Sequence, residues 1–381
     1  MLISDLLLTM LRVAMKARDV ARIIRSEHAL LDLLVEEKKG AEKNKRFKQD
    51  FKTLADVLIQ QMVSHDLVQQ FPEMKGSVYG EESNQFTNTL GETKTICLCA
   101  TTDLTRQLLM DILDDNEEAA TLLSEVVHRK AAAIPPVDKL GQVKTEIDSS
   151  DVGIWIDPID STAQYIRGSV GQLDEDGVTD GGLQCVAVLI GAFQKSTGLP
   201  IIGVAVQPFW ELDPETQLWT DQTTWGVCYQ DVRLASVRKN ENSNTPTKPV
   251  VIMSLSESDA VKQTLNDFRL RFAHGAGYKL LCTAQRRVDA YVLSKSSIYL
   301  WDCCAPHAIL RATGGGVVCF HDAVARAKST EGGRMSASDL KAFEVGYQLS
   351  SSQSGASGKS INGIIAYSCL EVLESIVQSL V

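Results

Sequence analysis

The stretch that decides the fold, residues 151–167, reads DVGIWIDPIDSTAQYIR. Its first half is an apolar, β-branched run that predicts a buried strand close to its end. Asp157 and Asp160 follow, on either side of a proline that cannot continue a hydrogen-bonded ladder. Ser161 and Thr162 are typical of a helix start, where free backbone N–H groups can bind an anion. Carboxylates for a metal ion and a cradle for phosphate thus occur together, which indicates metal-assisted phosphate chemistry.

The composition is that of a globular, acidic protein. The chain has 381 residues and 44% hydrophobic composition, which suits two lobes or one large domain. Its net charge of −10 argues against a general surface for nucleic acid or for an anionic membrane. The nine cysteines show no disulfide framework, and the charged N-terminal segment indicates an amphipathic helix rather than a signal peptide. We therefore expect a cytoplasmic, monomeric enzyme that binds neither nucleic acid nor membrane.

Apolar spacing predicts helices and strands on both sides of the central stretch. Residues 2–38 are expected to form two helices, and residues 51–71 another that Thr53 caps. The charged run 36–50 is interpreted as a solvated face or loop. The remaining expected elements before residue 240 are a strand in 77–84, helices in 101–133, a loop over 168–182, a hairpin of 183–194 with 199–207, and a further hairpin in 219–229.

The second half of the sequence alternates strands with helices, which predicts a layered α+β or α/β fold. The polar segment 236–249 is the expected boundary between an N-terminal lobe, 1–240, and a C-terminal lobe, 246–381. Residues 328–360 are interpreted as a mobile excursion. The expected elements are strands at 250–253, 289–293, 317–320 and 363–367, and helices at 257–271, 278–288 and 301–313 and at the C-terminus.

Elimination narrows the chemistry to metal-held water. Phosphate esters can be hydrolysed by a cysteine, aspartate or histidine nucleophile, or by water held on a metal. No cysteine is followed six positions later by arginine, and no Arg-His-Gly string is present. Residues 174–178, DEDGV, match the motif of aspartyl-phosphate phosphatases but lack the hydrophobic strand that must precede it.

Three segments carry a family resemblance: GEES at 80–83, WIDPIDST at 155–162 and WDCCAPHAIL at 301–310. They resemble the signature regions of the lithium-sensitive, Mg²⁺-dependent phosphomonoesterases, which include inositol monophosphatase, bisphosphate nucleotidase and fructose-1,6-bisphosphatase. The flanking residues are most similar to the branch that removes the 1-phosphate of inositol 1,4-bisphosphate and inositol 1,3,4-trisphosphate. The resemblance implies a five-layered αβαβα sandwich, two or three Mg²⁺ ions at the site, and Li⁺ as an inhibitor.

The resemblance also implies the metal ligands. Glu81, Asp157 and the carbonyl of Ile159 would hold the first Mg²⁺. Asp157 would also hold the second, together with Asp160 and Asp302. A plain N-cap role for Asp302 is the alternative that the sequence alone leaves open.

Catalytic and substrate-binding roles follow from the same resemblance. Thr162 would hold the attacking water, Asp56 would accept its proton, and Glu81 would take part through the metal. Backbone N–H groups from Asp160 to Thr162, with Ser161 between them, would hold the reacting phosphate. The expected contacts with the rest of an inositol polyphosphate come from Ser256, Gly275, Tyr278 and Lys279.

Two other functions remain open on the same residues. One is a 3′(2′),5′-bisphosphate nucleotidase built on the same scaffold. The other is a non-catalytic protein that binds inositol phosphates, which is disfavoured because every expected catalytic and metal-binding side chain is present.

Overall fold

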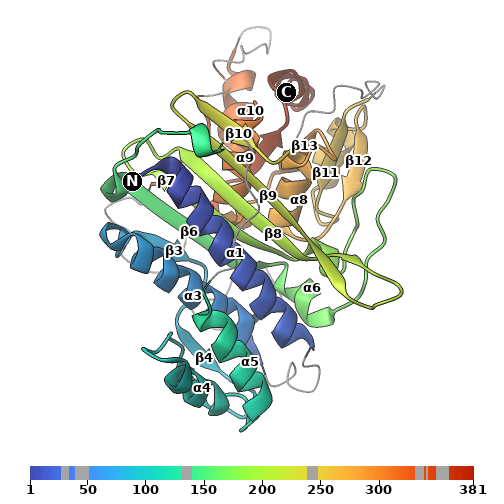
Figure 1. The fold of residues 1–381 in the computed structure, drawn as a ribbon. Coiled ribbons are helices and arrows are strands. Elements are labelled where there is room, and N and C mark those ends of the chain that lie inside the picture. The colour runs from blue at the N-terminus through green and yellow to red at the C-terminus, as the bar shows by residue number, and fades with distance from the viewer. Residues whose placement is uncertain are drawn as a thin grey trace.

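Two large β-sheets alternate with layers of helices in the computed structural model (Figure 1). The structure describes residues 1–26, 34–38, 51–130, 140–237, 248–330, 339, 342–348 and 360–381. Helices cover the outer face of each sheet, and further helices fill the space between the sheets. This order of layers confirms the αβαβα sandwich expected from the sequence. Within the described ranges, no helix combines the length and the apolar character needed to cross a membrane.

The first sheet has six strands in the order β10-β9-β8-β7-β6-β3. Neighbouring strands are antiparallel, except that β3 runs parallel to β6. The hairpin expected before residue 210 is confirmed as β7 and β8. The strands are β3 (Val78–Gly80), β6 (Val152–Asp160), β7 (Ala187–Gln194), β8 (Pro200–Leu212), β9 (Trp219–Tyr229) and β10 (Val232–Ala235).

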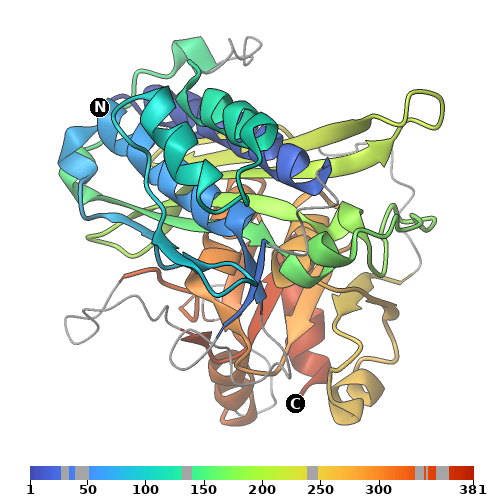
Figure 2. The same cartoon turned by 90° about the horizontal axis from the view of Figure 1, so that it is seen from below.

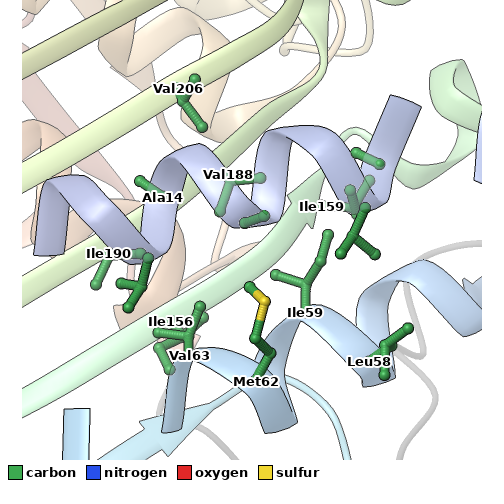
Figure 3. Packing of buried hydrophobic residues seen from close by; sticks show 14 of the residues in the cluster. Ala14, Leu58, Ile59, Met62, Val63, Ile156, Ile159, Val188, Ile190 and Val206 are labelled. Atoms are coloured by element: carbon green, nitrogen blue, oxygen red, sulfur yellow. The ribbon is translucent and has the colours of Figure 1, made fainter. Parts of the chain in front are cut away.

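Helices α1 (Ile3–Ser26) and α3 (Leu54–Gln70) cover the outer face of this sheet (Figure 1). Ala14 of α1, Met62 of α3 and Ile156 of β6 belong to one apolar cluster (Figure 3). This packing anchors the helix that carries Asp56. The smaller elements on this side are β1 (Val35–Glu37), β2 (Phe51–Thr53), β4 (Gln85–Thr87), β5 (Thr93–Thr95), α4 (Thr102–Met110), α5 (Glu117–His128) and α6 (Thr162–Arg167).

The second sheet has five strands in the order β12-β11-β13-β17-β15. Strands β12, β11 and β13 are parallel, and β17 is antiparallel to both of its neighbours. Figure 2 shows the N-terminal helices (blue and teal) and the C-terminal helices (orange and red) on opposite sides of the molecule. The strands are β11 (Val250–Met253), β12 (Arg269–Phe272), β13 (Ala290–Leu293), β15 (Gly316–Cys319) and β17 (Ile364–Tyr367). The helices are α7 (Asp259–Thr264), α8 (Ala276–Ala284), α9 (Leu300–Ala312), α10 (Phe320–Lys328) and α12 (Leu370–Ser379), and β14 (Ile298–Tyr299) pairs with β16 (Ser360–Ile361).

Helix α9 lies very close to the first sheet, because three strand residues that face it, Gly191, Gly203 and Gly226, are glycines. A Cβ atom on Gly203 would be 2.0 Å from the carbonyl oxygen of Ala305, and one on Gly191 would be 2.5 Å from its nitrogen. Only glycine permits this approach of helix to sheet. The close contact fixes the height of α9, and with it the position of Asp302 in its first turn.

The structure corrects four expectations from the sequence. The hairpin expected in 219–229 is the single strand β9, which pairs with β8 and β10. Residues 35–37, expected to be helical, form strand β1, which pairs with β2. The helix expected over 257–271 is the short α7 followed by β12, because the alternating sequence RLRF pairs with β11 at the sheet edge. Strand β6 does not end near residue 156 but continues through the proline to Asp160.

The two-lobe division stays a prediction. Most of the expected boundary, residues 238–247, lies outside the described residues, as does most of the segment 328–360. The apolar cluster between the sheets joins Trp155 and Leu189 from the first range to Tyr291 and Ile309 from the second. The two ranges therefore share one buried layer.

Candidate metal and phosphate site

The irregular end of β6 brings Asp157 and Asp160 into one cluster. In a regular strand, residues three apart point to opposite faces of the sheet. Here the pairing with β7 shifts, so that Asp157 pairs with Leu189 and Asp160 with Ala187. The irregularity falls at Pro158, which cannot donate a ladder hydrogen bond. The extra residue changes the alternation, and both carboxylates can face the same side.

The third carboxylate, Asp302, comes from the first turn of α9. Its Oδ2 accepts the N–H of Tyr299 at 2.6 Å, which ties it to the start of the helix. One carboxylate oxygen each from Asp157, Asp160 and Asp302 lies within 4.8 Å of the other two, and all three residues are buried. We call these residues the three-aspartate cluster. The structure thus brings together three of the expected metal ligands from two distant parts of the chain.

The three-aspartate cluster fits a divalent cation. Burial raises the pKa of all three carboxyl groups, and neighbouring carboxylates raise those of Asp157 and Asp302 further. Asp157 Oδ1 is buried without any hydrogen-bond partner among the described residues. Hard cations such as Mg²⁺ bind oxygen ligands of this kind, and a bound cation would stabilise the ionised carboxylates.

Glu81 lies beside the cluster but is paired with a lysine. It follows β3, and its N–H donates to the carbonyl of Ile156 at 3.2 Å. Lys38 Nζ lies 2.6 Å from Glu81 Oε1 and 2.5 Å from Glu82 Oε1. Burial alone would lower the pKa of Lys38, but the two carboxylates outweigh it and raise that pKa. The negative charge of Glu81 acts on the three-aspartate cluster, since it raises the pKa of Asp157. Glu81 is nevertheless not one of the residues whose carboxylate oxygens lie within 4.8 Å of one another.

Sequence reasoning missed Lys38. It belongs to the charged run 36–50, which the sequence predicts to be a solvated face or loop, whereas the Lys38 side chain is only 4% exposed. A run of lysines and glutamates gives no signal that one lysine is buried. Pairing of β1 with β2 is what turns this residue toward the site, and that pairing is not visible in the sequence pattern.

Asp56 and Thr162 lie in the site region but do not bond to each other. Asp56 Oδ2 accepts the N–H and the hydroxyl of Thr53 at 2.7 and 2.6 Å, which completes the cap of α3. Asp56 Oδ1 is buried without a hydrogen-bond partner among the described residues, and burial raises the pKa of Asp56 from 3.8 to about 7. The Thr162 hydroxyl instead donates to the carbonyl of Ile159 at 3.0 Å.

The turn between β6 and α6 contacts the start of α8. Ser161 has a φ of 71° and its hydroxyl donates to Asp160 Oδ2 at 3.0 Å. Asp160 also accepts the N–H groups of Gly277 at 3.0 Å and Tyr278 at 3.1 Å. A Cβ on Gly275 would be 2.1 Å from the Ser161 hydroxyl oxygen, and its φ of +76° also favours glycine. The first turn of α8 is thereby fixed against the three-aspartate cluster.

The other expected substrate contacts differ in how accessible they are. Ser256 is exposed, at the carboxyl end of β11, and its hydroxyl lies 3.0 Å from that of Ser254. The Tyr278 side chain is buried and its hydroxyl accepts the N–H of Thr179 at 2.9 Å. Lys279 is 4% exposed, and burial lowers its pKa to about 8. Only Ser256 among these three therefore presents its side chain at the surface.

The sequence is similar to those of known phosphatases. Residues 7–349 match the model of the inositol monophosphatase family. The sequence is 41% identical over 345 residues to the inositol polyphosphate 1-phosphatase of Homo sapiens, an alignment that covers 86% of each chain. It is 24% identical over 314 residues to the 3′(2′),5′-bisphosphate nucleotidase 1 of Mus musculus, with 81% of each chain covered.

A solved structure shares the fold. The crystal structure of the extragenic suppressor protein suhB from Bartonella henselae superposes with a TM-score of 0.50 at 14% identity, over 98% of this chain and 96% of that one. This likeness supports the layered fold alone. With the match over residues 7–349 and the 41% identity, the chain belongs to the inositol monophosphatase family of phosphomonoesterases.

Proposed function

We propose that this protein is a Mg²⁺-dependent phosphatase that removes the 1-phosphate of inositol 1,4-bisphosphate and inositol 1,3,4-trisphosphate. The observation that carries the proposal is the buried three-aspartate cluster, with Asp157 Oδ1 unpartnered, next to the turn that begins α6. The similarity to inositol polyphosphate 1-phosphatases supports the choice of substrate. Free cysteines and an acidic net charge support a cytoplasmic, monomeric enzyme.

Five residues would hold two or three Mg²⁺ ions. Glu81, Asp157 and the Ile159 carbonyl are assigned to one ion, and Asp157, Asp160 and Asp302 to another. Bound Mg²⁺ would acidify a water molecule and offset negative charge on the phosphate. Li⁺ would inhibit by taking one of these positions. Since Lys38 already contacts Glu81, the ion on that side has to share or displace the ammonium group.

Asp56 and Thr162 would handle the proton of the attacking water. A pKa near 7 suits a group that accepts a proton at neutral pH. Asp56 Oδ1 has no partner among the described residues and is free to accept one. The Thr162 hydroxyl would orient the water and pass its proton toward Asp56, which requires it to leave the Ile159 carbonyl. Proton transfer of this kind contributes about 10²–10⁴-fold to a rate.

The substrate would lie between two helix starts. Asp160, Ser161 and Thr162 would hold the reacting phosphate at the start of α6. Across the site, Gly275 gives the ring close access to the backbone at the start of α8. Tyr278 would contribute through its backbone, Lys279 would add positive charge behind it, and Ser256 would donate a hydroxyl hydrogen bond to the ring.

One assay tests the proposal: phosphate release from a panel of substrates, with Mg²⁺, with Mg²⁺ and Li⁺, and with a chelator. The panel contains inositol 1-phosphate, inositol 1,4-bisphosphate, inositol 1,3,4-trisphosphate, inositol 1,4,5-trisphosphate and adenosine 3′,5′-bisphosphate. We expect release from inositol 1,4-bisphosphate and inositol 1,3,4-trisphosphate only, suppressed by Li⁺ and abolished by the chelator. No release from these two with Mg²⁺ present would refute it.

A bisphosphate nucleotidase is the second candidate, favoured by the 24% identity to a nucleotidase over most of the chain. Faster release from adenosine 3′,5′-bisphosphate than from inositol 1,4-bisphosphate would select it. A non-catalytic binding protein would bind the substrates without release. The Asp56→Asn variant separates binding from catalysis, because it should lose turnover while retaining affinity for inositol 1,4-bisphosphate.

A further inference from the structure

The carboxyl ends of three parallel strands meet at the edge of the second sheet that faces the site. Ligands in sheets of this type bind beyond the carboxyl ends of the strands. Strand β12 ends at Phe272 and is followed by Ala273, His274 and Gly275, where α8 begins. Because Gly275 lies against the Ser161 hydroxyl and Asp160 Oδ2, this short segment touches the proposed phosphate turn. His274 is thus one residue away from that contact.

Lys279 holds this segment from behind. Its ammonium group donates to the carbonyl of Ala273 at 3.2 Å and to the carbonyl of Gly275. These are the residues directly before and after His274. With two of its three protons used on carbonyls and only 4% of its surface exposed, Lys279 is poorly placed to reach a ligand itself. Its geometry is that of a clamp on the loop that presents His274.

Two basic side chains beside this clamp have no hydrogen-bond or ion-pair partner among the described residues. His274 and Arg167, the last residue of α6, are both exposed, and neither the imidazole nor the guanidinium has a hydrogen bond or ion pair within the described ranges. Most arginines near the site are engaged. Arg269 and Arg271, for example, bind the acidic residues of the 174–176 segment at the neighbouring edge.

The charges of Lys279 and Arg167 affect the protonation of His274. Burial lowers the pKa of His274, and the charges of Lys279 and Arg167 lower it further, opposed by Asp180. The backbone carbonyl of Asp180 accepts the N–H of His274 at 2.9 Å, which fixes the loop in this place. The lowered pKa keeps the His274 imidazole largely neutral at pH 7, so His274 offers a hydrogen-bond donor beside the positive charge of Arg167, and the two together favour an anionic ligand.

We propose that Arg167 and His274 bind the phosphate that the substrate retains, and that Lys279 is a positioning residue for His274. The inference rests on the proposed function and assigns the contact to two residues that the family resemblance did not indicate. Arg167 lies five residues beyond Thr162 on α6, about 7.5 Å along the helix axis. One phosphate at the start of α6 and another near its end suit a ring that carries phosphates on opposite sides.

The first experiment compares Arg167→Ala and His274→Ala with matched controls. The controls are Arg233→Ala on the edge strand β10 and His65→Ala on α3, both exposed residues of the same types. We measure steady-state release from inositol 1,4-bisphosphate and competitive inhibition by inositol 4-phosphate, the product that carries only the retained phosphate. Each test variant should raise KM and the inhibition constant about tenfold, with kcat within about twofold, and the controls should change neither.

The second experiment tests the clamp through non-additivity. Lys279→Met should raise KM, and combining it with His274→Ala should raise KM no further, because both changes remove the same contact. If the increases in KM of the two single variants multiply in the double variant, Lys279 does not act by positioning His274. Unchanged KM and inhibition constant in both Arg167→Ala and His274→Ala, with melting temperatures equal to the parent, would overturn the phosphate contact.

Failure of the proposed function has a different signature. If the parent protein releases no phosphate from inositol 1,4-bisphosphate, that function is wrong whatever the variants do. The contact of Arg167 and His274 with a phosphate is then tested by calorimetric titration with adenosine 3′,5′-bisphosphate, which also carries a second phosphate. Weaker binding in Arg167→Ala and His274→Ala supports the phosphate contact, and equal binding refutes it.

Discussion

The two groups of acidic residues at the site differ in how their charge is balanced. The three-aspartate cluster has no ion pair with any described lysine or arginine, and its carboxyl groups have raised pKa values. Glu81 and Glu82, which lie beside this cluster, share the buried ammonium group of Lys38. One lysine thus offsets part of the charge of the glutamate pair, whereas no described lysine or arginine forms an ion pair with the three aspartates. We therefore expect the ionised state of the three aspartates to depend on a bound cation more than that of Glu81 and Glu82 does.

Asp157→Asn should have the largest effect. Asp157 is the residue assigned to both ions, and its Oδ1 has no other partner. Phosphate release should fall roughly 10³-fold, because the charge that organises the reacting group is lost. Without metal, the variant should melt at a higher temperature than the parent, since one of several crowded buried charges is gone. Activity within tenfold of the parent, measured with saturating Mg²⁺, would show that the cluster does not act as assigned.

Lys38→Met should destabilise the metal-free protein by about 3 kcal/mol, because breaking a buried ion pair leaves the partner charge unpaired. Lys38 and Glu82 have side chains that are 4% and 2% exposed. Adding Mg²⁺ should restore part of this loss, since a cation near Glu81 can take over the role of the ammonium. Urea unfolding with a chelator and with Mg²⁺ measures both effects.

Lys16→Met is the matched control for Lys38→Met. Lys16 is also a lysine with a 4% exposed side chain, and it pairs with Asp66 at 2.5 Å on the helices away from the cluster. We expect a comparable loss of unfolding free energy that Mg²⁺ does not restore. Equal rescue of both variants by Mg²⁺ would mean that the ion acts on the whole protein and not at Glu81.

The stability of the metal-free protein should fall as pH rises. Burial raises the pKa of Asp56 from 3.8 to about 7, so the folded state holds its proton more tightly than the unfolded chain does. The stabilisation is complete below pH 4 and is lost as pH rises through 7. The raised pKa values of the three-aspartate cluster act in the same direction. Melting temperatures with a chelator should decline by several degrees between pH 5 and pH 8, whereas Mg²⁺ or Asp56→Asn should reduce the slope.

Ser161→Gly should have the smallest effect, within about 1 kcal/mol of the parent. The substitution removes a hydroxyl that donates to Asp160, which disfavours the ionised cluster. It also removes the backbone strain of a serine with a φ of 71°, a conformation that glycine adopts readily. Chemical unfolding with a chelator measures the balance. A loss of several kcal/mol would mean that the Ser161 hydroxyl stabilises the cluster far more than its two backbone donors do.

The sequence predicted those parts of the site that are local. The apolar run before Asp157 became the buried strand β6, and Thr53 caps α3 in the expected position. Both depend on short-range periodicity and on capping, which a few adjacent residues determine. The αβαβα order of layers could be predicted because the family resemblance extends over most of the chain.

The parts that were missed depend on contacts between distant segments. Lys38 is buried because β1 pairs with β2. Residues 269–272 form a strand because they pair with the edge of β11. Arg167 and His274, which we propose bind the retained phosphate, come from segments far apart in the chain, and His274 lies in no motif. Pattern reasoning cannot place such residues, since the decisive partner is far away in the chain.

The glycines beneath α9 make the reaction sensitive to changes far from any ligand. A methyl group at Gly203 would act as a wedge between helix and sheet, because its Cβ would be 2.0 Å from the Ala305 carbonyl oxygen. The wedge would lift the helix that carries Asp302 and pull one carboxylate away from the other two. Loss of metal affinity can therefore arise from a substitution that leaves every charged and polar group of the molecule unchanged.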